Sequence, residues 1–219
     1  MKQLQHPHLM RTYGLVKINQ SEIGIVMELC GSHNFSTLIR VQRQYGELRL
    51  KKNLNRLYEL ACGLNFMHLK GISHFDIKPS NFFFTEDENP VIGDFGLSRS
   101  IETSQENGTM GFTLPYCSPE QLKKMLELEN KPSDVWSFGM SIYEITTGLK
   151  PFREIYPESG RLKMKEMIYE VVANKRTPLI SREFEKEHRV LVGIMRECWV
   201  MAENRLHIST IRKRLKKII

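Results

Sequence analysis

The stretch HFDIKPSN, from His74 to Asn81, is the part of this sequence from which the fold is inferred. It places an aspartate, a lysine and an asparagine within one short segment, with Pro79 holding the middle. An apolar run, Phe82 to Phe84, follows directly. Taken alone, Asp76 would be an ordinary turn residue. Its neighbours favour a chemical site instead, because they supply an acid, a cation and an amide oxygen together.

The same residue types, with Asp94 further on, meet the needs of phosphoryl transfer. That reaction requires a positioned nucleophile, neutralised phosphate charge and metal ions held by oxygen ligands. An aspartate accepts the proton of an attacking hydroxyl, and a lysine two residues on balances charge on the moving phosphoryl group. An asparagine oxygen and a second aspartate are ligands that Mg²⁺ prefers. The sequence therefore contains the side chains that this chemistry uses.

Length and composition are those of an ordinary globular protein. The 219 residues suffice for one large domain or two lobes, with 41% hydrophobic and 26% charged residues. No stretch approaches the roughly 18 apolar residues of a membrane span. The first 20 residues are too polar for a signal peptide, so we expect an intracellular, cytoplasmic protein. The four cysteines form no CxxC pair, and we expect reduced thiols at Cys30, Cys62, Cys117 and Cys198.

Basic residues give the chain a net charge of +7, and part of it lies in RKRLKK, Arg212 to Lys217. A basic tract can contact nucleic acid or anionic lipid. Ile208, Ile211 and Leu215 recur at helical spacing through the same segment, which favours a terminal helix with a basic solvent face. We therefore do not expect nucleic acid as a partner.

The order of the predicted elements indicates an α+β fold. Strands over Leu9–Val16 and Glu22–Cys30, joined by the loop KINQS, predict an antiparallel hairpin. Apolar residues at i, i+3, i+4 and i+7 predict a helix over Lys52–Leu69, and two short strands around an acidic turn follow Asn81. Strands followed by helices are typical of this class. The later helices are expected at Asp134–Gly148, buried at the centre, and at Arg161–Val172, Phe184–Met201 and His207–Ile219.

Five motifs in order make the chain resemble the eukaryotic protein kinase family. HFDIKPSN resembles the catalytic loop H-R-D-x-x-x-x-N, and Asp94-Phe95-Gly96 is identical to the metal-binding triplet D-F-G. Ser118 to Glu120, S-P-E, resembles A-P-E. SDVWSFG resembles the buried helix that follows, and CWVMAENR resembles the last conserved region of the family. MKQLQHPHL resembles the end of the regulatory helix and the turn after it. The resemblance covers the whole chain.

The resemblance implies the reaction and its cofactors. ATP would be the phosphate donor, Mg²⁺ the metal and a protein the substrate. Asp76 corresponds to the catalytic base, Lys78 to the lysine that contacts the γ-phosphate, and Asn81 and Asp94 to the Mg²⁺ ligands. Met27 corresponds to the gatekeeper, and the backbone from Glu28 to Cys30 to the segment that bonds adenine.

The resemblance also implies supporting roles. Thr113 corresponds to the threonine that steadies the base and the lysine, Glu120 to a partner of Arg205, and Asp134 to a brace for the catalytic loop. His74, with Phe95 and Gly96 of the D-F-G triplet, is expected to be structural rather than catalytic.

The lysine two residues after the base implies transfer to serine or threonine hydroxyls, because tyrosine kinases usually place other residues there. SDVWSFG and the CW pair lean towards the tyrosine-kinase-like group, whose members mostly phosphorylate serine and threonine. The sequence thus predicts a serine/threonine kinase.

Two features depart from the family pattern. Phe75 replaces an arginine that can pair with a phosphate on the activation loop. We therefore hypothesise that the chain is not switched on by that pairing, and that a loop hydroxyl such as Thr109 is dispensable.

The second departure is in the small lobe. Residues 1–30 contain neither the glycine-rich loop nor the strand lysine nor the helix glutamate, so we expect 1–30 to be a small-lobe remnant and 31–219 the large lobe. Three explanations are open. The chain is a fragment of a complete kinase, which the intact catalytic loop favours; it is a pseudokinase-like module that binds partners without catalysis; or a partner protein covers and completes the truncated small lobe.

Overall fold

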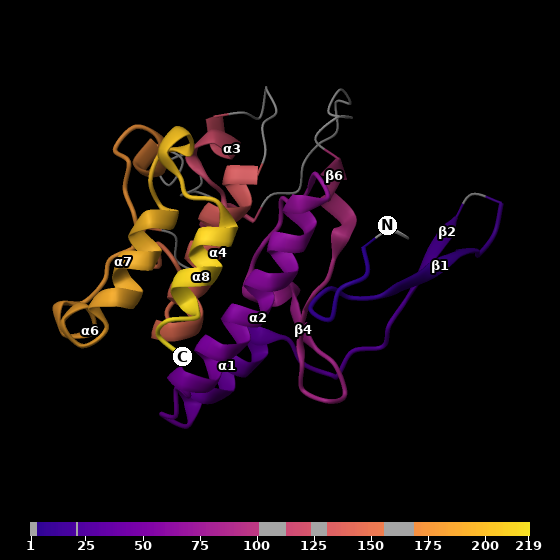
Figure 1. The fold of residues 1–219 in the computed structure, drawn as a ribbon, viewed down its shortest axis with the longest axis horizontal. Coiled ribbons are helices and arrows are strands. Elements are labelled where there is room, and N and C mark those ends of the chain that lie inside the picture. Colours follow the sequence, from indigo (N-terminus) through magenta and orange to yellow (C-terminus); the bar gives the residue numbers. More distant parts are fainter. Residues whose placement is uncertain (1–3, 21, 101–112, 124–130, 156–168) are drawn as a thin grey trace.

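A projecting hairpin and a mostly helical body make up the chain (Figure 1). The computed structural model describes residues 4–20, 22–100, 113–123, 131–155 and 169–219. The chain combines short antiparallel strand pairs with a larger set of helices, and this confirms the predicted α+β class.

The hairpin pairs β1 (Thr12–Lys17) with β2 (Ile23–Met27) in antiparallel register. Its two ends are attached to the body by backbone hydrogen bonds. Met10 N–H donates to the Ile92 carbonyl at 2.8 Å, and Gly31 N–H donates to the Phe84 carbonyl at 2.8 Å. Both acceptors belong to a second strand pair, β4 (Phe82–Phe84) with β5 (Pro90–Ile92). The hairpin and the body therefore join beside the segment that follows the catalytic loop.

The core lies between two long helices, α2 (Leu50–Leu69) and α4 (Lys131–Thr147). The apolar face of α2 is fully buried at Leu57, Leu60 and Leu64, as its spacing predicts. Helix α4 is buried almost all round, because α2, α7 and the catalytic loop pack against it. The expected central helix is confirmed.

The remaining elements surround these two helices. They are α1 (Phe35–Gln44), β3 (Ile72–Ser73) paired with β6 (Arg99–Ser100), η1 (Pro79–Asn81), η2 (Phe95–Leu97), η4 (Leu114–Tyr116), α3 (Pro119–Lys123), α6 (Arg182–Glu187), α7 (Arg189–Cys198), η6 (Ala202–Asn204) and α8 (Ile208–Leu215). Helix α8 packs along α2 with Ile208, Ile211 and Leu215 buried. This arrangement confirms the expected amphipathic terminal helix.

Several elements differ from expectation. Helix α1 was not predicted, and the helix expected over Phe184–Met201 is divided into α6 and α7 by the non-helical backbone of His188. The helix expected over Arg161–Val172 lies largely outside the described residues. In the described part of the expected N-terminal helix end, residues 4–6 have no regular structure. Within the described residues, no helix is long and apolar enough to cross a membrane.

Candidate active site

Asp76 lies at the centre of a hydrogen-bonded cluster of four side chains. Its Oδ1 accepts from the Thr113 hydroxyl at 2.9 Å, and its Oδ2 lies 2.6 Å from Lys78 Nζ. Asn81 Nδ2 donates to the same Oδ2 at 2.9 Å and to the Asp76 carbonyl at 2.8 Å. Lys78 Nζ also donates to the Thr113 hydroxyl at 2.7 Å. The carboxylate is therefore held from both of its oxygens.

Local sequence explains how these side chains meet. Pro79 opens the single turn η1, since a proline with fixed φ is favoured at the first position of a helical turn. The turn returns Asn81 to Asp76, while Lys78 precedes it in an extended conformation. Thr113 comes from the start of η4, far along the chain. The structure thus brings together four of the residues that the sequence singled out.

Asp134 fixes the backbone on the other side of Asp76. Its Oδ2 accepts from the backbone N–H of His74 at 2.8 Å, and its Oδ1 accepts from that of Phe75 at 2.8 Å. His68 Nε2 lies 2.8 Å from the same Oδ2. All of these groups are buried, so each hydrogen bond is made where water cannot replace it. The loop is therefore attached directly to the central helix α4.

His74 connects the loop to the segment that carries Asp94. Its Nε2 hydrogen-bonds the Gly93 carbonyl at 3.0 Å, and its Nδ1 accepts from Asp76 N–H at 3.3 Å. This pattern requires a neutral ring protonated on Nε2. Burial lowers the pKa of His74 despite nearby carboxylates, which agrees with a neutral ring. We find His74 in a structural position, packed against Phe95 with ring centroids 5.5 Å apart.

Gly93 places Asp94 next to Asn81. Its N–H donates to the Asn81 carbonyl at 2.9 Å, so the two segments run side by side. A side chain at Gly93 would lie 2.6 Å from Met10 Cε and 2.9 Å from the Phe83 ring, so only glycine fits. Asp94 itself has left-handed backbone, with φ 59°, and is solvent-exposed. Non-glycine residues in this conformation often lie at functional sites.

Asn81 and Asp94 carry oxygen atoms of the kind that a magnesium ion takes. The amide nitrogen of Asn81 is used by Asp76, so its carbonyl oxygen points away from that carboxylate. An amide oxygen and an exposed carboxylate are hard ligands of the kind that Mg²⁺ takes. Among the described residues, no group of three or more His, Cys, Asp or Glu side chains could form a closed metal site. Mg²⁺ usually completes its ligands with water and substrate phosphates.

The residues expected to bond adenine lie at the end of the hairpin. Met27 ends β2 and is 43% exposed, and Glu28 N–H donates to the Arg11 carbonyl at 2.8 Å. Partial burial, and then the charge of Glu28, raise the pKa of Cys30. Within the described part of the chain, no hydrogen bond or ion pair joins Met27, Glu28 or Cys30 to the Asp76 cluster.

Glu120 and Arg205 form a bidentate ion pair, with Arg205 Nη2 at 3.1 Å from Glu120 Oε2. The guanidinium lies over the Trp136 ring, 5.2 Å from its centroid, and its Nε donates to the Val200 carbonyl at 3.0 Å. Burial alone would raise the pKa of Glu120, but the hydrogen bond and charge of Arg205 outweigh it and lower that pKa. The pair joins α3 to the segment before α8.

Phe75 has left-handed backbone, with φ 67°, and its side chain is only 8% exposed. Gln121 Nε2 donates to its carbonyl at 3.4 Å, which holds this residue from α3 as well as from Asp134. The side chain that replaces the family's arginine is therefore part of the interior. Thr109 and the other loop hydroxyls from Thr103 onward lie outside the described residues.

Two contacts at the site were not anticipated from the sequence. His68 shares Asp134 with the catalytic loop, and the Tyr116 hydroxyl donates to the Glu144 carboxylate. Tyr116 and Glu144 are buried, and burial followed by the charge of Glu144 raises the pKa of Tyr116 well above its usual value. Both contacts join residues distant in sequence, so local patterns did not identify the partners. A buried glutamate inside the apolar helix α4 was a usable signal, because such a group requires a partner.

Comparison with known proteins finds a match to the family described as "Protein kinase domain", over residues 1–214. "Ankyrin repeat and protein kinase domain-containing protein 1" of Mus musculus is 29% identical over 208 residues, which are 91% of this chain and 26% of that protein. "Mitogen-activated protein kinase kinase kinase 4" of Homo sapiens is 33% identical over 160 residues, 69% of this chain and 9% of that protein.

"Aurora kinase" of Debaryomyces hansenii is 27% identical over 206 residues, which are 90% of this chain and 48% of that protein. The chain therefore spans less than half the length of each of these three relatives. Its similarity to them concerns one region that they share.

Proposed function

This chain belongs to the protein kinase family, and we propose that it transfers the γ-phosphate of ATP to serine or threonine hydroxyls of proteins. The observation that carries the proposal is the cluster of Asp76, Lys78, Asn81 and Thr113, in which every side chain contacts at least one other. A relative from Dictyostelium discoideum is named "Serine/threonine-protein kinase atg1". ATP is an intracellular substrate, so we also place the activity inside the cell.

Each side chain of the cluster has a task in this reaction. Asp76 accepts the proton of the substrate hydroxyl, and Thr113 and Asn81 aim its carboxylate. Lys78 neutralises charge on the phosphoryl group during transfer. Asn81 and Asp94 would hold Mg²⁺, which supplies charge neutralisation on the phosphates. Since little covalent work falls to the protein, these positions account for most of the expected catalysis.

Phosphate transfer from radiolabelled ATP to a mixed protein substrate tests the proposal. We expect Asp76→Asn and Asp94→Asn each to abolish transfer, because one removes the base and the other a metal ligand. Asp87→Asn is the matched control, since Asp87 is an exposed carboxylate on the turn between β4 and β5. Circular dichroism checks that all variants are folded. Absence of transfer by the unmodified chain with Mg²⁺ and ATP would contradict the proposal.

A pseudokinase-like binding module is the second candidate. The hairpin favours it, because β1 and β2 lie alone with apolar side chains exposed, and a partner that covers them would bury that surface. No residue within 1–30 supplies the lysine and glutamate that would position ATP phosphates. A binding module should retain its partner in Asp76→Asn and Asp94→Asn, and its melting temperature should not respond to Mg²⁺ and ATP. A kinase should instead show a higher melting temperature with Mg²⁺ and ATP, and it should lose phosphate transfer in both variants.

A further inference from the structure

A basic groove lies along α1, outside the Asp76 cluster. It has a volume of about 610 Å³ and is lined by residues of α1 and of the segment that follows α4. Arg40 and Arg43 come from α1, and Lys150 comes from the opposite wall. All three side chains are exposed, and among the described residues none of them has an ion pair or a hydrogen bond. Three cations thus line the groove, and no described carboxylate forms an ion pair with any of them.

Among the described residues of the lining, the only carboxylate lies beneath the groove. Glu144 is 4% exposed and accepts a hydrogen bond from the Tyr116 hydroxyl. Its carboxylate is therefore hydrogen-bonded in the interior, while the three cations face solvent. The hydroxyls of Ser36 and Thr37 lie in the same lining and can donate to oxyanions. Together these groups favour an anionic ligand.

Gly148 lies close to the stem of Arg43 at the groove. It has left-handed backbone, with φ 71°, and a side chain there would lie 2.9 Å from Arg43 Cγ and 3.0 Å from Arg43 Cδ. Only glycine accommodates both the backbone and this close approach. The stem of Arg43 lies against the end of α4, which limits the positions available to its guanidinium.

The groove is connected to the Asp76 cluster by one short turn. Thr113, bonded to Asp76, begins η4, and Tyr116, bonded to Glu144, ends it. The turn η4 therefore lies between the Asp76 cluster and the groove, and a substrate peptide would extend past it to reach both.

We propose that this groove selects protein substrates in which acidic or phosphorylated side chains lie a few residues from the acceptor hydroxyl. The inference rests on the proposed kinase function and names the substrate class for that site. Carboxylate and phosphate present the same anionic oxygens to arginine and lysine, so either source satisfies the groove. The cations supply selection between substrates, and the Asp76 cluster supplies the reaction.

Fluorescence anisotropy with labelled peptides tests the groove without requiring catalysis. The probes are a peptide with a central serine flanked by glutamates, its glutamine counterpart, and a version with two phosphoserines among the flanking residues. The unmodified chain should bind the glutamate peptide about tenfold more tightly than the glutamine peptide at low salt, and less so at high salt. Tighter binding of the phosphoserine peptide would identify phosphate as the preferred source, and equal binding would identify carboxylate.

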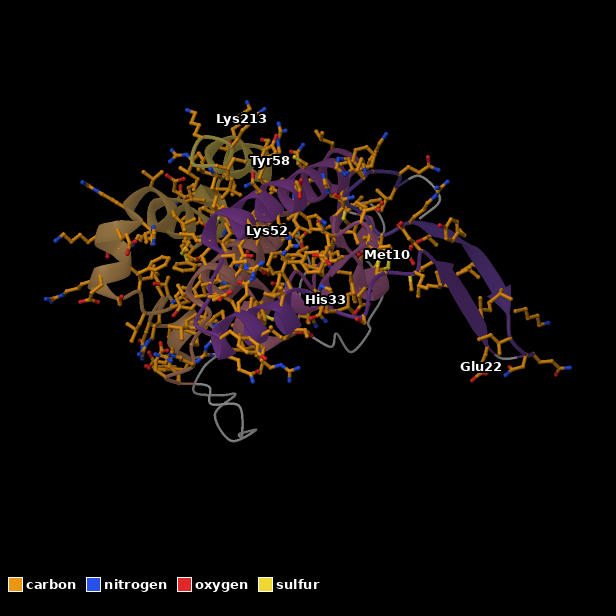
Figure 2. The ribbon with its side chains drawn as sticks, turned by 90° about the horizontal axis from the view of Figure 1, so that it is seen from below. Met10, Glu22, His33, Lys52, Tyr58 and Lys213 are labelled. Atoms are coloured by element: carbon orange, nitrogen blue, oxygen red, sulfur yellow. The ribbon has the colours of Figure 1, made fainter. Side chains whose placement is uncertain are left out.

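A double charge reversal, Arg40→Glu with Arg43→Glu, should remove the preference. The matched control is Lys52→Glu with Lys213→Glu, which changes the net charge equally on α2 and α8 (Figure 2). The control should retain the preference. Equal binding of glutamate and glutamine peptides by the unmodified chain would overturn the proposal, and so would equal loss in both double variants, which would indicate bulk electrostatics.

The two proposals fail separately. A chain that prefers the acidic peptide in binding but transfers no phosphate contradicts the kinase function and leaves the groove standing as a binding site. A chain that phosphorylates both peptides at the same rate and binds them equally contradicts the groove and leaves the kinase function standing.

Discussion

At the scale of single residues, the hydroxyl of Thr113 has two partners at once. It donates to Asp76 and accepts from Lys78, so one small side chain sets the separation between the carboxylate and the cation. Both partners are charged, and hydrogen bonds to charged groups are the stronger kind. A methyl group at this place would leave Asp76 with one oxygen unrestrained.

Thr113→Ala should lower kcat by about 10- to 100-fold, because a small displacement of the base is costly to a positioned reaction. The KM for ATP should change little, since Thr113 contacts the base and the lysine rather than the hairpin segment. Thr113→Ser should restore most of the activity, as it keeps the hydroxyl. Steady-state kinetics of the three proteins check this. A serine variant as slow as the alanine variant would show that the hydroxyl is not the responsible group.

The sequence predicted the members of the Asp76 cluster because they occur in short motifs. Asp76, Lys78 and Asn81 share one loop, and their side chains lie together as the chemistry required. The motif could not indicate His68 or the Tyr116 pair with Glu144, because their contacts are set by how α2, η4 and α4 pack. Their roles, like those of the catalytic residues, remain predictions that the variants test.

At the scale of elements, the ion pair of Glu120 and Arg205 joins α3 to the segment before α8. Arg205 has a fully buried side chain, so removing its partner leaves a charge in the interior. Breaking such a pair costs roughly 3–5 kcal/mol. Helix α3 has only five residues and depends on contacts of this kind for its position.

Glu120→Gln should therefore destabilise the fold strongly at neutral pH. The pKa of Glu120 is lowered in the folded state from its usual value of 4.5, so its contribution is complete above that pH and is lost as the pH falls through the lower folded-state pKa. The difference in stability between the two proteins should shrink on acidification. Urea unfolding at several pH values measures it. Glu185→Gln, in an exposed pair with Arg196, is the control and should have little effect at any pH.

The long helix α2 was predicted and the short helix α1 was not, although the apolar residues of α1 also lie on one face. Helix α2 repeats its apolar residues over five turns, whereas α1 combines the β-branched Thr37, Ile39 and Val41 with polar residues that disfavour a helical reading. The signal that was overlooked is Asn34, whose side chain accepts from Thr37 N–H at 3.0 Å and caps α1. The break at His188 had no local signal.

At the scale of the whole molecule, the hairpin extends away from the helical body, with Glu22 near its tip (Figure 2). Among the described residues its strands pair only with each other, and an isolated two-stranded sheet is marginal in water. Leu15 and Ile25 lie opposite each other and are 70% and 45% exposed. The division into a remnant of residues 1–30 and a large lobe of 31–219 remains a prediction.

We expect the chain to self-associate through this hairpin at micromolar concentration, because exposed apolar strands pair with other chains. Leu15→Glu with Ile25→Lys should reduce the association, since the opposite charges preserve the cross-strand pair. Leu69→Glu is the control, at a residue 72% exposed on α2, and should not change it. Light scattering after size-exclusion chromatography measures the mass. A monomer at all concentrations would contradict this expectation.

The attachment of the catalytic loop to Asp134 has a consequence for how such proteins evolve. Asp134 binds the loop through the backbone N–H groups of His74 and Phe75, which every residue except proline possesses. A different residue at position 75 could therefore make the same two hydrogen bonds, provided that it fits the buried position and the left-handed backbone of Phe75. Natural selection can thus alter how such a protein is controlled while leaving its chemistry intact.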